Sequence, residues 1–209
     1  MGPTSSVSRR VCQPFAVEAT SLGQEALSNK TYWQNNVYRA GGAFSLPVKL
    51  IQQRVRQKIP QLSKHLMPRV LAIVSSHIGA TAFMSDETAM QFLLGGYKFG
   101  FLISNPEQQY QWPAFENSVL IQRDRDNPDE IVAAGKTVSA LLLIALDGGG
   151  FSAVGILHPE PHFPVDPCVF PDVPFLYVSP WPPREGKIQV KWTAETYPIR
   201  RIDLTPIRL

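Results

Sequence analysis

The chain has 209 residues, of which 44% are hydrophobic and 18% are charged, a composition that excludes a wholly disordered polypeptide. The length fits one domain, or at most two small ones, with a core large enough to need no disulfide or metal. The sequence contains no apolar run of about 18 residues, so we expect no membrane-spanning helix.

The two cysteines, Cys12 and Cys168, are far apart in the sequence, which favours two free thiols in a reducing compartment over a disulfide framework. The N-terminus has no apolar signal core. We therefore expect an intracellular protein, cytoplasmic or within a particle, without a secretion signal.

The net charge of +3 conceals a strong segregation of charge along the chain. Residues 1–85 contain ten basic and two acidic residues (+8), whereas residues 86–209 contain ten basic and fifteen acidic ones (−5). No acidic residue lies between Glu25 and Asp86. Segregation on this scale suggests a polyanionic partner or a complementary surface on a neighbouring subunit.

The N-terminal part of the chain is predicted to be helical and basic. Residues 1–13 are expected to form a flexible basic arm, and short strands are expected at 15–20 and 32–39. From Val48 to Ile73 the apolar residues recur at steps of three and four, which predicts one continuous helical stripe. Since Pro60 and Pro68 interrupt helices, we expect kinked pieces at about 46–58 and 61–77.

The following segments carry clear signals for helix ends and turns. Ser85 followed by Asp86 and Glu87 predicts a helix that ends at Gly95-Gly96. A second, short helix is expected to open at Asn127-Pro128 and to close near Gly135. The remaining expected elements are strands at 97–104 and 118–123, a loop at 105–116, and a β-hairpin of 137–146 with 151–157.

Residues 159–183 contain nine of the nineteen prolines together with five aromatic residues. Proline cannot donate to a sheet ladder, so this segment is predicted to be largely extended coil. A loop this long and apolar is expected to wrap over its own domain or to bind a partner. Closing strands are expected at 187–192 and 199–204.

These elements predict an α+β fold in which a mostly antiparallel sheet packs against a kinked basic helical segment (about 46–77), with a long proline-rich wrapping loop. The expected domains are the arm of 1–13 and a single domain of 14–209. Within that domain we expect a basic helical part at about 43–94 and a β-rich part at about 97–209.

The sharpest local pattern is His158-Pro159-Glu160-Pro161-His162. In an extended chain residues 158, 160 and 162 point the same way, so His158, Glu160 and His162 could form three legs of a metal site. Asp166 or Cys168 is a candidate fourth ligand. The alternative is a proline-stiffened surface loop with incidental polar residues.

No catalytic constellation can be read from the sequence. Gly135-Lys136-Thr137 matches the end of a phosphate loop, but Glu130 stands where the required upstream glycine would be. No Ser–His–Asp or Cys–His arrangement is evident. We therefore lean against an enzyme and expect no cofactor.

The basic tract is the broader functional signal. On a helix its cations flank the apolar stripe, where phosphates of RNA or DNA would be neutralised; the alternative is a solvated face or one paired with a neighbouring copy. The candidate polyanion-binding residues are Arg9, Arg10, Lys49, Arg54, Arg56, Lys58, Lys64 and Arg69.

The favoured hypothesis is a non-enzymatic structural or assembly subunit of a virion, phage particle or ribonucleoprotein. It would contact nucleic acid or acidic partner surfaces through residues 30–69, and its partners would be other protein subunits and RNA or DNA. One alternative is a metal-dependent enzyme or metal-binding β-domain built on His158, Glu160 and His162. A second is an adaptor that binds a protein partner through 159–183.

Overall fold

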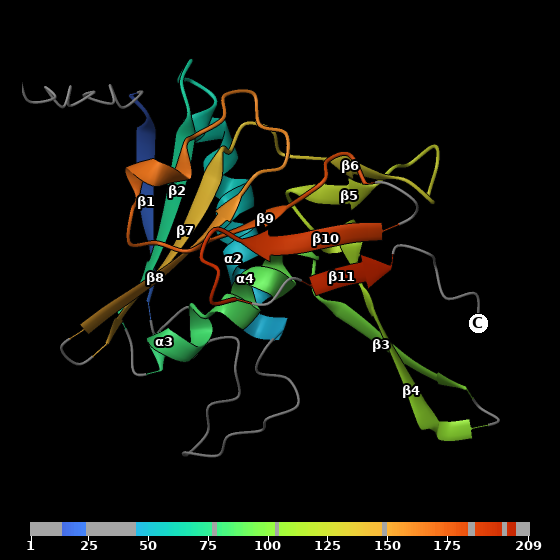
Figure 1. Cartoon of the computed structure of the whole chain (residues 1–209). Helices are drawn as coiled ribbons and strands as arrows, with labels where there is room; N and C mark the ends of the chain where they lie inside the picture. The colour runs from blue at the N-terminus through green and yellow to red at the C-terminus, as the bar shows by residue number, and fades with distance from the viewer. Residues whose placement is uncertain are drawn as a thin grey trace, which may run out of the picture.

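A computed structural model of the chain describes residues 14–23, 45–76, 79–102, 105–147, 150–183, 187–197 and 200–203 (Figure 1). The expected N-terminal arm, with Arg9 and Arg10, and the strand expected at 32–39 lie outside the described residues. No described helix is long and apolar enough to cross a membrane.

The described chain is a mixed α/β structure organised around a seven-stranded sheet (Figure 1). Its β1–β2, β2–β7 and β8–β9 pairings are parallel, and the other three are antiparallel. The sheet is thus evenly mixed, where a mostly antiparallel one was predicted, because α2 and longer connections return the chain between parallel strands. The strand order is β1 (Ala16–Leu22), β2 (Arg69–Ser75), β7 (Ala140–Asp147), β8 (Gly150–Leu157), β9 (Phe175–Val178), β10 (Lys187–Trp192) and β11 (Arg200–Asp203).

Helix α2 (Ser45–Leu62) carries Pro60 in its last turn. The helical piece predicted at 61–77 is wrong beyond Leu62, because residues 63–68 form turns and bends and Arg69–Ser75 forms strand β2. Helix α2 ends six residues before Pro68, and β2 is buried on both faces between β1 and β7. A short apolar run of this kind has no periodicity that separates a buried strand from a buried helix.

Helix α4 (Asp86–Leu93) begins and ends where its sequence signals predict. The Ser85 hydroxyl accepts a hydrogen bond from the Thr88 N–H at 3.3 Å, which caps the first turn. After the helix, Gly95 has φ +78°, and a Cβ there would lie 2.2 Å from the Ala114 carbonyl oxygen. The short α3 (Ala80–Phe83) precedes α4.

Two hairpins extend beyond the large sheet: β3 (Tyr97–Leu102) with β4 (Asn105–Pro113), and β5 (Ile121–Arg123) with β6 (Ile131–Ala133). β4 replaces most of the loop predicted at 105–116.

The helix predicted to open at Asn127 is replaced by the turn between β5 and β6. The Asp124 carboxylate accepts the N–H groups of Asp126 and Asn127 there, and this side-chain turn competes with helix formation.

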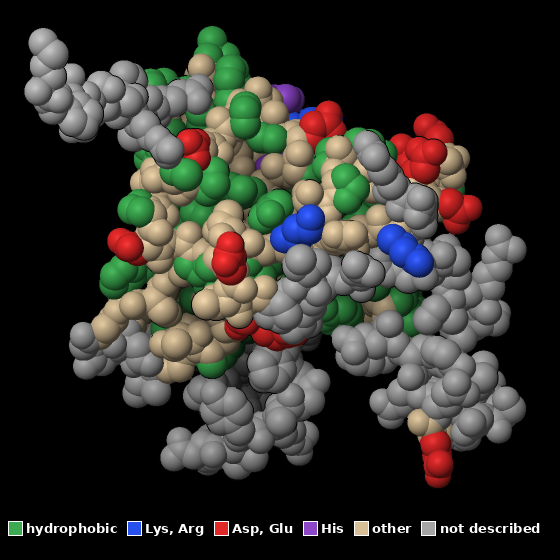
Figure 2. Space-filling model, viewed as in Figure 1, with side chains coloured by type: hydrophobic (Ala, Val, Ile, Leu, Met, Phe, Trp, Pro, Cys, Tyr) green, Lys and Arg blue, Asp and Glu red, His purple; other side chains and the backbone are tan. Residues whose placement is uncertain are grey.

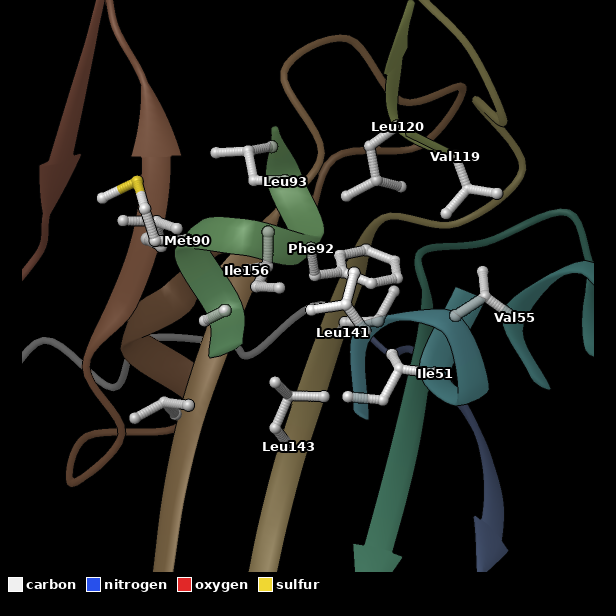
Figure 3. Packing of buried hydrophobic residues seen from close by; sticks show 14 of the residues in the cluster. Ile51, Val55, Met90, Phe92, Leu93, Val119, Leu120, Leu141, Leu143 and Ile156 are labelled. Carbon is white, nitrogen blue, oxygen red and sulfur yellow. The ribbon is translucent and has the colours of Figure 1, made fainter. Parts of the chain in front are cut away.

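The two faces of the sheet are covered differently. Helices α2 and α4 pack on one face, where Ile51, Phe92 and Leu141 belong to the main core (Figure 3). The proline-rich segment crosses the other face, where Phe170 and Val173 pack on a smaller cluster. Its short turn η2 (Pro167–Val169) lies in front of β1 in Figure 1. The segment also supplies β9, which is held inside the sheet between β8 and β10.

Candidate functional site

The outward face of α2 carries the cations that the sequence singled out. Lys49 and Arg56 are exposed on one flank of the helix, and Arg54 and Lys58 are half-buried on the other. Gln53 and Gln57 are exposed between the flanks. We use "the outward face of α2" for these six residues.

Contacts within the chain engage part of this charge. Arg56 donates a hydrogen bond to the Asn117 carbonyl at 3.0 Å, and Arg54 donates to the Gln57 side chain at 3.4 Å. Lys58 forms an ion pair with Glu18 of β1 at 2.7 Å.

Lys49, and Lys64 beyond the helix, are exposed and make no ion pair with any described residue. The charge available to a partner is therefore greatest at Lys49 and Lys64.

Arg69 does not belong to this surface, which corrects its place among the candidate polyanion-binding residues. Only 4% of Arg69 is exposed. Its guanidinium donates to the carbonyls of His65 and Thr137, at 2.6 Å from Nε and 3.1 Å from Nη1. The group also lies over the Phe163 ring, 5.2 Å from its centroid. The Arg69 guanidinium is therefore buried and bonded within the protein, where it cannot contact a phosphate.

Gln52 also departs from the outward face. It is buried on the core side of α2, and its Nε2 has no hydrogen-bond partner among the described residues. An unpaired buried amide costs free energy of folding. Its position follows from the helical period, since Gln52 lies one residue after the fully buried Ile51 and three before Val55.

His158 is a buried structural residue, which removes the first leg of the predicted metal site. Its Nε2 lies 2.6 Å from the Ala134 carbonyl oxygen, and its Nδ1 accepts the Glu160 N–H at 3.0 Å. These partners require a neutral ring with the proton on Nε2. Burial, the largest cause, and the nearby Lys136 charge together lower the pKa of His158 to about 4, against the opposing effect of the Ala134 hydrogen bond. With both ring nitrogens engaged, His158 has no lone pair for a metal.

The other two predicted ligands do not complete a metal site either. Glu160 accepts a hydrogen bond from Lys136 at 2.6 Å and one from the Trp181 indole at 3.3 Å. The Lys136 hydrogen bond, followed by that from Trp181, holds the pKa of Glu160 below its ordinary value. His162 is exposed. Among the described residues no group of three His, Cys, Asp or Glu side chains could hold a metal, so the metal hypothesis fails on geometry.

Ser139 is the polar residue that the sequence reasoning missed. Its hydroxyl donates to the Phe163 carbonyl at 2.5 Å and accepts the Arg69 N–H at 2.8 Å. Its own carbonyl accepts the His158 N–H at 3.0 Å. We call Arg69, Ser139 and His158 the Arg69 cluster. The one available signal was a lone serine directly before the apolar run of β7.

The face of the sheet opposite α2 is different in character. Figure 2 shows hydrophobic side chains gathered over β1, β2, β7 and β8, while the visible Lys and Arg side chains lie mainly toward β10. Exposed hydrophobic residues on β1, β7 and β8 are Val17, Leu146 and Phe151. This face does not resemble a polyanion-binding surface, so the cationic candidates remain those of α2 and Lys64.

No family model, curated protein or solved structure matches the chain.

Proposed function

We propose that the protein is a non-enzymatic subunit of a larger assembly, such as a virion, phage particle or ribonucleoprotein, that contacts nucleic acid. The contact surface is the outward face of α2 together with Lys64, and Arg9 and Arg10 add charge from the N-terminal side. The observation that carries the proposal is that α2 has four cations and no carboxylate in eighteen residues.

The arrangement of these cations suits a backbone contact better than recognition of a base sequence. Two cationic flanks enclose the amides of Gln53 and Gln57, and amides can donate to phosphate or sugar oxygens. Each phosphate neutralised on B-DNA changes the slope of log affinity against log salt by about −0.9. Three contacts from Lys49, Arg54 and Lys64 therefore predict a slope of about −3.

The test compares two triple variants with the same loss of charge. Lys49→Gln/Arg54→Gln/Lys64→Gln removes the candidate surface. Arg125→Gln/Lys187→Gln/Lys191→Gln removes three cations from other elements. Affinity for labelled single- and double-stranded oligonucleotides is measured by fluorescence anisotropy across a salt series.

We expect the α2 variant to lose at least tenfold in affinity and about three units of salt slope, while the control loses much less. Equal losses of affinity in the two variants would mean that binding depends only on the net charge of the protein and not on the outward face of α2. No binding by the wild-type protein would overturn the proposal. Binding of a polyglutamate peptide instead of the oligonucleotides would identify an acidic protein as the partner.

A further inference from the structure

The two edges of the seven-stranded sheet differ in how they are protected. Strand β11 has four residues, of which Arg200, Arg201 and Asp203 are charged. Charged residues and short length are the usual protection of an edge strand against pairing with another chain. Strand β1 has seven residues, one charge, no proline and an unbroken register with β2.

The free hydrogen-bonding groups of β1 can be assigned from its pairing. The Ala16 N–H donates to the Pro68 carbonyl at 2.8 Å, so Ala16 faces β2. Since backbone groups alternate along a strand, the N–H and C=O groups of Val17, Ala19 and Ser21 point away from β2. No described strand pairs with β1 on that side. All three residues are exposed, Val17 to 53%.

We infer that β1 pairs in antiparallel fashion with β1 of a second copy of this chain, about a two-fold axis at Ala19. In this register Ala19 lies opposite Ala19 of the second copy, and Val17 lies opposite Ser21. Each of these residues turns its backbone groups outward, so every outward N–H meets an outward C=O. The pairing is isologous and closes as a dimer.

The charges of β1 are compatible with this partner. Glu18 lies opposite Thr20 of the second copy, so the two Glu18 side chains do not face each other directly. Each Glu18 is already paired with Lys58 of its own chain. The axis therefore joins two neutral Lys58–Glu18 pairs in opposite orientation, which places each ammonium near both carboxylates.

The apolar surface is continuous across the same axis. Val17 and Ala19 are in register with Val70 and Ala72 of the smaller core cluster, so their side chains lie on the sheet face opposite α2. Pairing joins the two copies of that face. The inference does not depend on nucleic-acid binding, because it uses the sheet edge and not the outward face of α2.

The first test measures the mass of the full chain by sedimentation equilibrium. For the wild-type protein we expect a species of twice 23.3 kDa. Val17→Lys and Ala19→Pro should each raise the dissociation constant of the dimer at least tenfold, so that the monomer predominates. The Ala19 N–H points away from β2, so proline there removes no hydrogen bond between the described strands. Phe151→Lys, which places a lysine on the same face away from the edge, should remain dimeric. A monomeric wild-type protein at about 100 μM, or dimers of both edge variants, would overturn the inference.

The second test reads the register and does not rely on loss of association. In a background of Cys12→Ser and Cys168→Ser, Ala19→Cys places two thiols on a pair with a Cα separation of about 5.5 Å, within disulfide range. Oxidation should give a crosslinked dimer. Val17→Cys should not crosslink, because the two copies of residue 17 are offset by four positions, about 13 Å. Crosslinking of Val17→Cys but not Ala19→Cys would exclude this two-fold axis.

Discussion

The outward face of α2 and the Arg69 cluster contain cations from the same acid-free stretch, in opposite environments. Lys49 on the outward face of α2 is exposed, as is Lys64 two residues beyond the helix. Arg69, five residues after Lys64, is instead buried, and its guanidinium donates to two carbonyl oxygens and lies over an aromatic ring. None of the three has an acidic partner among the described residues. A cation without a carboxylate partner can thus be a free surface charge, as at Lys64. It can also be a buried donor that joins separate segments, as Arg69 joins β2 to Thr137 and Phe163.

The difference arises because Arg69 lies where strands β2 and β7 begin. Arg69 is the first residue of β2, and its N–H reaches Ser139, directly before β7. Carbonyls left over at these strand starts need donors, and a guanidinium supplies several in a fixed plane. In α2 the backbone N–H groups of later residues serve most of the carbonyls, although Pro60 has no N–H to donate to the Arg56 carbonyl.

The largest expected effect is from removing the Arg69 side chain. Arg69→Met should lower the free energy of unfolding by about 3 kcal/mol, because the carbonyls of His65 and Thr137 lose a charged donor. Urea unfolding at pH 7.5 measures it. Lys64→Met is the matched control and should stay within about 0.5 kcal/mol of the wild type. Equal stability of the two variants would remove the distinction between the regions.

An effect of similar size is expected from pH, through His158. Its pKa of about 4 in the folded chain lies below the ordinary 6.5, so the unfolded chain binds more protons between these values. Stability contributed by the neutral ring is complete above pH 6.5 and is lost as the pH falls toward 4, by about 3 kcal/mol in total. Urea unfolding between pH 7.5 and 4.5 should show this slope.

His158→Gln should flatten that slope, while His162→Gln, which alters an exposed ring, should preserve it. An unchanged slope in His158→Gln would mean that other groups cause the acid sensitivity. The comparison separates buried from exposed histidines four residues apart.

The smallest effect concerns the buried side of α2. Gln52→Leu should raise the free energy of unfolding by about 1 kcal/mol, because it removes an unpaired buried amide and keeps the side-chain volume similar. Thermal or urea unfolding measures the change, with the exposed Gln53→Leu as control. Destabilisation by Gln52→Leu would indicate that the amide has a partner outside the described residues.

Local signals predicted the elements whose ends are defined by nearby residues. Ser85 and Gly95 set the limits of α4, and the hairpin predicted at 137–146 with 151–157 is present as β7 and β8. The 69–75 strand was missed because its apolar residues continue the helical spacing of α2, and only pairing with β1 and β7 decides against a helix. Strand β9 was missed because four residues between prolines give too short a pattern.

The site was harder to predict than the fold. The sequence placed Lys49, Arg54, Arg56 and Lys58 correctly on the flanks of a helix, because the helical period alone fixes them. It could not separate Arg69 from Lys64, or identify His158 as buried, because Arg69 and His158 depend on carbonyls that lie 68 and 24 residues away in the sequence. The sequence gives the number of charged side chains, but contacts between distant segments determine which of them are buried.

The position of β2 between β1 and β7 has a consequence for synthesis on the ribosome. Val70 pairs with Ala140, so the strand that covers the second side of β2 emerges some seventy residues later. At about 5–20 residues per second, nascent chains spend about four to fourteen seconds with β2 still open on that side. A protease that acts before residue 140 has been synthesised would therefore meet a polypeptide that has its first helix but lacks the centre of its sheet.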